Sequence, residues 1–184
     1  KIMKAKKNSS KTELGILEID VTVDCSHWSS ALSEPVASAK KACEAVFQNV
    51  KTGSSNKAAE VSILLTNDLM VRSLNNEYRN QDKSTNVLSF PTDTKAMPIT
   101  NFPILLGDII VAFETSYNEA IIENKSLSDH LCHLIVHGML HLLGFDHQVS
   151  SDADAMEDIE ISVLHKLNVA NPYEIRMSKD SVSL

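Results

Sequence analysis

The segment HGMLHLLGFDH, residues 137–147, constrains the fold of this chain more than any other part of the sequence. It ends a helical pattern in which, at about 100° per residue, imidazoles gather on one flank and apolar side chains on the other. The imidazole flank carries His130, His133, His137 and His141, and the apolar side carries Leu131, Ile135 and Leu142. This helix therefore requires a hydrophobic core against one side, and it presents histidines on the other.

The spacing of three histidines in this segment predicts a metal site. His137 and His141 stand one helical turn apart, so that both imidazoles can reach one ion from a single helix. Gly144 can adopt a left-handed conformation that ends the helix, which allows His147 to supply a third nitrogen from outside it. Three neutral nitrogen ligands and an open position are typical of a catalytic zinc site. We predict a Zn²⁺ ion held by these three histidines.

The residue after the first histidine separates this segment from the zinc peptidases that share its spacing. Metzincin peptidases place there the glutamate that acts as general base, whereas this chain has Gly138, and neither Met139 nor Leu140 can replace it. Peptidase chemistry is therefore impaired. A metal can still generate a nucleophile, because it lowers the pKa of bound water from 15.7 to about 7. The charge that develops on the substrate then needs another stabilising group, and a fixed cation would suit a phosphodiester.

The order of the expected elements predicts an α+β fold. Apolar alternation and short apolar runs predict strands at 17–23, 59–66, 87–91 and 109–116. Apolar residues spaced three and four apart predict helices at 35–50, 68–79, 127–143 and 151–167, with Asn67 and Ser126 placed as caps. Gly107 is placed for a turn or bulge at the start of the last strand. The order β-α-β-α-β-β-α-α predicts a small four-stranded mixed sheet with helices mainly on one face.

Length and composition indicate a single acidic domain with short tails. The 184 residues, 43% of them hydrophobic, suffice for one domain with a sizeable core. We place a metal-dependent hydrolase domain at 13–174, between a flexible basic tail at 1–12 and a C-terminal tail at 175–184. A net charge of −7 argues against binding nucleic acid through the global field, so RNA would need a local basic patch. The lysines of the basic tail are a candidate patch, and the alternative is a solvated tail.

The remaining histidines and the cysteines have ordinary interpretations. His133 stands one turn before His137, and we interpret it as a residue that supports the metal site or the core. Surface or core positions are expected for His27, His130 and His165. Buried, reduced thiols are expected for Cys25, Cys43 and Cys132, which lie far apart and form no C-x-x-C pair. The sequence contains neither an apolar run near the roughly 20 residues of a membrane span nor a secretion signal, so we expect a cytoplasmic protein without a membrane partner.

Four segments of this chain resemble the YbeY endoribonucleases. The signature H-G-x-L-H-L-x-G-Y-D-H of that family is closely matched by HGMLHLLGFDH. Its N-x-x-Y-R and T-D-V-L-S-F-P segment is similar to LNNEYRNQDKSTNVLSFP, its G-D-I strand to LLGDIIVAFE, and its C-terminal end to NPYE. These segments cover about residues 59–174 in the family's order. The resemblance implies a zincin-like α+β fold with a four-stranded mixed sheet.

The resemblance also implies an activity, partners and site residues. The activity is that of a metal-dependent endoribonuclease specific for single-stranded RNA, which acts in 16S rRNA 3′-end maturation and in ribosome quality control. The implied partners are an rRNA precursor, the small ribosomal subunit and its assembly proteins. In the family the three histidines hold the metal, usually zinc, and the arginine of the Y-R segment, Arg79 here, is needed for activity. From the chain alone, an arginine at this helix end would be interpreted as a surface salt-bridge residue.

Two departures from the family pattern bear on the site. Asn86 stands where the pattern usually has aspartate, which puts a carboxylate role at this position in doubt. Phe145 replaces the usual tyrosine, so a hydroxyl beside the third ligand cannot be essential in this chain. Asp146 is retained, and we interpret it as a residue that supports the ligands or the turn rather than as a ligand.

Three functions remain open at this point. The first is a metal-dependent endoribonuclease in which Arg79 stabilises charge on the phosphate. The second is a peptidase or amidase that uses the same zinc, which the spacing favours and Gly138 disfavours. The third is a non-catalytic ribosome-assembly factor in which the metal only stabilises the fold, and the acidic composition is compatible with it.

Overall fold

The computed structural model describes residues 15–50, 58–93, 103–146 and 150–174 of the chain. The predicted tails at 1–12 and 175–184 lie outside the described residues, and so does His147. The strands are β1 (Leu17–Val23), β2 (Ala59–Thr66), β3 (Val87–Pro91) and β4 (Ile104–Ala112). The helices are α1 (Ser26–Ala31), α2 (Pro35–Asn49), α3 (Asp68–Arg79), α4 (Phe113–Ile122), α5 (Leu127–Leu142) and α6 (Ser150–Lys166).

The four strands form one mixed sheet in the order β1-β2-β4-β3. β1, β2 and β4 run parallel, and β3 pairs antiparallel with β4 at the edge. The register aligns Val23 with Leu65 and Leu65 with Val111, so the three parallel strands end together. At the opposite end of the sheet, Pro91 of β3 pairs with Gly107 of β4. The sheet therefore has two distinct ends, and each carries a candidate site described below.

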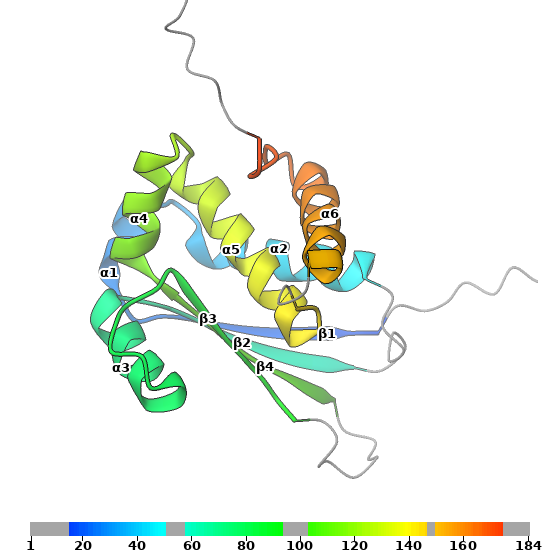
Figure 1. The fold of residues 1–184 in the computed structure, drawn as a ribbon, viewed down its shortest axis with the longest axis horizontal. Coiled ribbons are helices and arrows are strands. Elements are labelled where there is room, and N and C mark those ends of the chain that lie inside the picture. The colour runs from blue at the N-terminus through cyan, green and yellow to red at the C-terminus, as the bar shows by residue number, and fades with distance from the viewer. Residues whose placement is uncertain (1–14, 51–57, 94–102, 147–149, 175–184) are drawn as a thin grey trace, which may run out of the picture.

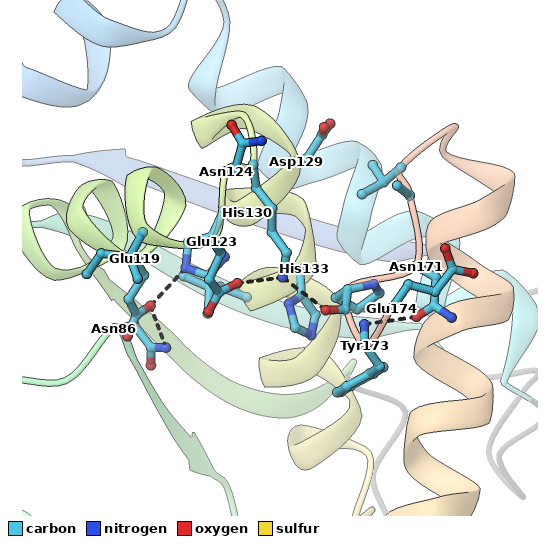
Figure 2. A pocket seen from close by; sticks show the side chains of 16 residues that line it. Asn86, Glu119, Glu123, Asn124, Asp129, His130, His133, Asn171, Tyr173 and Glu174 are labelled. Carbon is cyan, nitrogen blue, oxygen red and sulfur yellow. Dashed lines mark hydrogen bonds and ion pairs between the residues drawn. The ribbon is translucent and has the colours of Figure 1, made fainter. Parts of the chain in front are cut away.

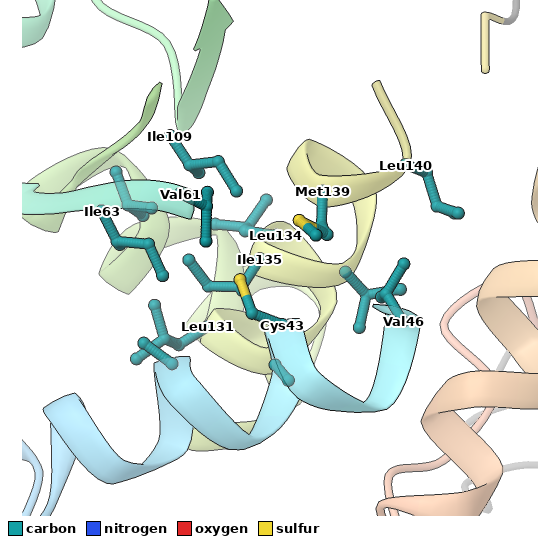
Figure 3. Packing of buried hydrophobic residues seen from close by; sticks show 14 of the residues in the cluster. Cys43, Val46, Val61, Ile63, Ile109, Leu131, Leu134, Ile135, Met139 and Leu140 are labelled. Carbon is teal, nitrogen blue, oxygen red and sulfur yellow. The ribbon is translucent and has the colours of Figure 1, made fainter. Parts of the chain in front are cut away.

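Most of the helices cover one face of the sheet. α2 and α5 pack on that face and α6 packs against α5, whereas α3 lies on the other side (Figure 1). The main core lies between the sheet and the larger helical layer, where side chains of α2, α5, β2 and β4 interlock (Figure 3). A smaller apolar cluster under α3 contains Val71, Leu88, Ile110 and Ala112. The predicted α+β class, the four-stranded mixed sheet and the helices mainly on one face are confirmed.

The prediction is wrong for the C-terminal half of the last strand. The sequence predicted a strand at 109–116 and no helix after it, whereas β4 ends at Ala112 and α4 begins at Phe113. The apolar run IIVAF concealed the boundary, because periodicity cannot separate a buried strand from the start of a helix. The strand instead begins earlier, at Ile104, and passes Gly107 in a bulge where its pairing with β2 shifts.

The predicted bulge at Gly107 is confirmed, and its glycine is required there. Gly107 has φ of +135°, a backbone conformation that residues with a side chain rarely adopt. A Cβ atom would also lie 2.1 Å from the carbonyl oxygen of Phe90 on β3. The close approach lets β3 and β4 remain paired through the irregular step.

The first turns of α3 and α4 cap each other. The backbone N–H of Asp68 donates to Oε2 of Glu114 at 2.8 Å. In return, the backbone N–H of Thr115 donates to Oδ1 of Asp68 at 3.0 Å, and the Thr115 hydroxyl donates to Oδ2 at 2.9 Å. Unpaired N–H groups at two helix starts are thus satisfied by side chains of the opposite helix.

In the part of the chain that the structure describes, no helix is both long and apolar enough to cross a bilayer.

Candidate active site

Hydrogen bonds at both termini of α5 determine where this helix begins and ends. The Ser126 hydroxyl oxygen accepts a hydrogen bond from the Asp129 N–H, which starts the helix where the sequence predicted. At the other end Gly144 has φ of +92°, and the Phe145 N–H donates to the carbonyl oxygen of Leu140 at 3.1 Å. This is the glycine turn that commonly ends helices, and it brings the Phe145 backbone back beside the last helical turn.

His137 and His141 present their Nε2 atoms to each other at 3.0 Å. Nδ1 of His137 lies 2.7 Å from Oε1 of Glu160, and Nδ1 of His141 lies 3.0 Å from the carbonyl oxygen of Phe145. A carboxylate and a carbonyl only accept hydrogen bonds, so Nδ1 of each ring carries a hydrogen, and Nε2 is the atom through which each ring could bind a metal. Both imidazoles are therefore held in the tautomer that binds a metal through Nε2.

The spacing of the two Nε2 atoms suits a shared ion. Two lone pairs at this distance repel each other unless a proton or a cation lies between them. Zinc–nitrogen bonds of about 2.0–2.1 Å in tetrahedral geometry would hold the two nitrogens about 3.3 Å apart, a few tenths of an ångström from the observed separation. The pair of donors and their fixed tautomers fit a zinc ion. The predicted third ligand, His147, lies outside the described residues.

Glu160 of α6 is the carboxylate that supports this pair, and the sequence analysis missed it. Its side chain is 1% exposed, although a buried carboxylate is unfavourable unless it is paired. Burial raises the pKa of Glu160, but hydrogen bonds from His133, His137 and Tyr173 outweigh burial and hold that pKa at about 2. The position of Glu160 in the helix could have revealed it. Glu160 lies one turn after the apolar Met156, on the buried side of α6. An acid inside an apolar stripe indicates a buried partner.

His133 belongs to the same hydrogen-bond network as His137 and His141. Its Nε2 lies 3.4 Å from Oε2 of Glu160, and its ring packs edge-on against those of His137 and Tyr173. The Tyr173 hydroxyl donates to the same carboxylate oxygen. Burial and the neighbouring Glu160 carboxylate raise the pKa of Tyr173, so the phenol stays protonated and can donate. This placement agrees with the interpretation of His133 as a supporting residue.

Gly138 faces the sheet and not the His137–His141 pair. A Cβ atom at this position would lie 3.0 Å from both Cγ2 of Ile109 on β4 and Oγ of Ser89 on β3. A larger side chain would therefore push α5 away from the sheet. A glutamate at this position would be accommodated only if Ile109 or Ser89 moved, so packing as well as chemistry disfavours the peptidase base here.

Arg79 and His141 line the same cleft. The cleft has a volume of about 490 Å³ and is lined by Arg79, Ser89, Pro91, His141, Gly144, Phe145 and Asp146. Nη2 of Arg79 donates to the carbonyl oxygen of Ser89 at 3.1 Å, and its guanidinium lies 5.7 Å from the ring centre of Phe90. These contacts hold a cation over the edge strand. The structure thus brings together a predicted metal ligand and the predicted charge-stabilising residue, along with Asp146.

Asn86 lies elsewhere, in a larger pocket of about 1040 Å³ that is lined by His130 and His133 of α5. Its amide nitrogen donates to Oε2 of Glu119 at 2.9 Å, and Nε2 of the buried His130 lies 2.8 Å from the same oxygen (Figure 2). His133 and Tyr173 line this pocket as well. An aspartate at position 86 would face Glu119 with a second negative charge, so asparagine suits this neighbour.

A separate group of side chains that could hold a metal ion lies at the other end of the sheet. Single donor atoms of Cys25, His27 and Glu114 all lie within 4.8 Å of one another. Cys25 is a buried free thiol, as expected from the sequence, but its proximity to His27 and Glu114 was not predicted. Residues 25 and 114 are far apart in the sequence, so no local pattern could reveal their contact.

Comparisons with known proteins agree with the motifs and the fold. The model of the family described as Endoribonuclease YbeY matches residues 24–168, inside the domain predicted at 13–174. A protein of Azorhizobium caulinodans named Endoribonuclease YbeY is 43% identical over 162 residues, which are 86% of this chain and 98% of that protein. A protein of Parvibaculum lavamentivorans with the same name is 40% identical over 178 residues, which are 91% of this chain and 92% of that protein.

A solved structure shows the same fold at lower sequence similarity. The solution structure of a protein from Thermotoga maritima aligns with a TM-score of 0.50 and 20% identity. The alignment covers 88% of this chain and 99% of that chain. At this identity the likeness concerns the fold, whereas the family is shown by the sequence matches. The chain belongs to the endoribonuclease YbeY family, whose members are hydrolases that cleave RNA internally.

Proposed function

We propose that this chain is a metal-dependent endoribonuclease that cleaves single-stranded RNA at the cleft between α5 and β3. His137, His141 and His147 would hold a Zn²⁺ ion, and Arg79 would bind the phosphate that is attacked. The supporting observation is the single cleft that contains both His141 and Arg79. The zincin-like description of the fold belongs to this proposal, because it depends on a metal held by one helix and the segment after it.

The chain's own residues prepare the site for this chemistry. When bound, zinc would activate water and polarise the phosphodiester. Glu160 and the Phe145 carbonyl orient the two imidazoles through Nδ1, so both rings turn Nε2 toward the proposed ion. The Arg79 guanidinium is anchored to the edge strand through one of its five N–H donors. Its planar fork suits two phosphate oxygens, and the charge that develops on them would be stabilised.

The substrate is proposed to be a precursor of 16S rRNA, cleaved near its 3′ end. A net charge of −7 means that RNA affinity must come from local contacts such as Arg79 rather than from the global field. The small ribosomal subunit and its assembly proteins would then present the RNA strand, and ribosome quality control would use the same cleavage. These partners place the proposed activity in the cytoplasm.

A peptidase function is disfavoured because Gly138 supplies no general base and is closely packed against Ile109 and Ser89. A non-catalytic assembly factor would bind the same metal but cleave nothing. The purified chain should therefore be incubated with single-stranded RNA, duplex RNA and casein, with and without a chelator. We expect cleavage of single-stranded RNA alone, and loss of that cleavage with the chelator. Casein cleavage would favour the peptidase, and no cleavage despite bound zinc would favour the assembly factor.

Two variants test the assigned residues separately. Arg79→Ala should lower the rate of RNA cleavage by about 10²–10³-fold, the effect of removing one donor to transition-state charge, while zinc content stays unchanged. Arg72→Ala is the matched control, since Arg72 lies on the same helix and pairs with exposed Asp82. His141→Ala should lose the zinc that is proposed to bind at His137 and His141. Cleavage near the wild-type rate by Arg79→Ala, or unchanged zinc content in His141→Ala, would refute the respective assignment.

A further inference from the structure

We propose that Cys25, His27 and Glu114 form a second metal site, for a zinc-class divalent ion, at the carboxyl ends of the parallel strands. Cys25 follows β1, His27 lies in the first turn of α1, and Glu114 lies in the first turn of α4. The cleft that contains Arg79 and His141 is lined by Pro91, which pairs with Gly107 toward the opposite end of the sheet. The two sites share no residue, so this proposal does not depend on the proposed function.

The distances within the group match zinc coordination. Sγ of Cys25 lies 3.6 Å from Nδ1 of His27, and a carboxylate oxygen of Glu114 completes a set within 4.8 Å. Zinc bonds of about 2.3 Å to sulfur and about 2.0–2.1 Å to nitrogen, at a tetrahedral angle, separate those two atoms by about 3.5 Å. The Cys–His pair therefore needs almost no movement to bind one ion.

The surrounding structure holds each donor in place. The Cys25 N–H donates to the carbonyl oxygen of Leu65 at 3.3 Å, which fixes the end of β1 against β2. The His27 ring packs against the ring of Phe113, the first residue of α4, with the two ring centres 5.3 Å apart. Glu114 is oriented by the Asp68 N–H, which donates to its Oε2 at 2.8 Å. Hydrogen-bonded carboxylates and packed imidazoles are typical supports of metal ligands.

The donor chemistry selects a zinc-class ion over magnesium or calcium. Thiolate and imidazole ligands suit zinc and its neighbours, whereas magnesium and calcium require mainly oxygen ligands. A thiolate and a carboxylate together balance the charge of a divalent ion. Cys25 is buried and His27 is exposed, so a water molecule can complete the coordination from the solvent side. Such a site would join the end of β1 to the start of α4.

Cobalt(II) provides a probe that reads this site alone. A cobalt–thiolate bond produces a charge-transfer absorption in the near ultraviolet, which imidazole and carboxylate ligands at the histidine site do not produce. We expect this band in the wild type and in His141→Ala, but not in Cys25→Ser. Cys132→Ser is the matched control, since Cys132 is a half-buried free cysteine on α5, and it should retain the band.

A second variant tests the carboxylate without disturbing the fold. Glu114→Gln keeps an oxygen that can accept from the Asp68 N–H, but it should lower cobalt and zinc affinity at least 10- to 100-fold, the loss known for weaker changes around metal ligands. Zinc should also raise the Tm of His141→Ala by about 5–10 °C at a hundredfold excess over Kd. Absence of the band in the wild type, or a band that Cys25→Ser and Glu114→Gln leave unchanged, would overturn the proposal.

Discussion

Replacing Glu160 by glutamine would isolate the contribution of one buried carboxylate to the histidine site. Glutamine preserves the size of the side chain and an oxygen that can accept from His137 Nδ1, but it removes the negative charge. We expect zinc affinity to fall about tenfold or more. RNA cleavage should fall in parallel at limiting zinc and recover in part at saturating zinc, because His137 can still bind when the ion is in excess.

The magnitude follows from the 2.7 Å contact between Glu160 and His137. A hydrogen bond to a charged group contributes about 1.5–3 kcal/mol, roughly twice a neutral one, so loss of the charge removes about 1–1.5 kcal/mol. A difference of about 1.4 kcal/mol is tenfold in affinity. The glutamine NH₂ group would also face His133 and the Tyr173 hydroxyl, which now meet an acceptor, so tenfold is the lower end of the expected range.

The assay is a zinc titration of the metal-free protein against a chromophoric chelator, with initial rates of single-stranded RNA cleavage measured in parallel. Glu157→Gln is the matched control, because Glu157 undergoes the same charge change on the exposed side of α6. Thermal unfolding of both metal-free variants separates a loss of fold from a loss of affinity. A folded Glu160→Gln protein with zinc affinity within about twofold of the wild type would refute the argument that this carboxylate orients His137.

Three further perturbations have defined outcomes. Gly138→Glu restores a peptidase-like motif, but it should reduce the free energy of unfolding by about 3–5 kcal/mol and give no casein cleavage, because the charge is forced against Ile109. Asn86→Asp should cost about 1–3 kcal/mol in urea unfolding, since the donor to Glu119 is replaced by a second carboxylate. Removal of metal by a chelator should abolish RNA cleavage and lower Tm by about 5–10 °C, and zinc should restore both.

For each of these three perturbations, a defined result would contradict the expectation. Gly138→Ala should cost about 2 kcal/mol or less, because better helix propensity of about 1 kcal/mol offsets part of the overpacking. A Glu variant as stable as the Ala variant would contradict the packing argument. Equal stability of Asn86→Asp and the wild type would show that the contact with Glu119 contributes little. Full RNA cleavage by metal-free protein would contradict the assigned chemistry.

The sequence predicted those parts of the fold whose signals are local. Strand and helix limits in 17–23, 59–66, 68–79 and 87–91 agree with the structure, because alternation, apolar spacing and the Asn67 cap all act within a few residues. α4 was missed because the apolar run IIVAF hides the end of β4, and because Asp68, which accepts from the Thr115 N–H in its first turn, comes from another helix. Local patterns therefore located the elements but not every boundary between them.

The same distinction applies to the sites. His137 and His141 were predicted because a helical turn alone brings them together. Glu160 reaches His137 from a different helix, and Glu114 reaches Cys25 only through the parallel register of β1, β2 and β4. These contacts follow from topology, which the order of elements constrains only loosely. The resemblance to the family, rather than the chain's own pattern, identified Arg79.

The reciprocal cap between α3 and α4 has a consequence for local opening of the molecule. Helix ends usually fray independently, but each of these first turns depends on a side chain of the other helix. Although 46 residues separate Asp68 from Glu114, the two turns should open and close together. Hydrogen exchange should accordingly show similar protection for the Asp68 and Thr115 amides. The first turns of α3 and α4, beside Cys25, would then fluctuate as one cooperative unit.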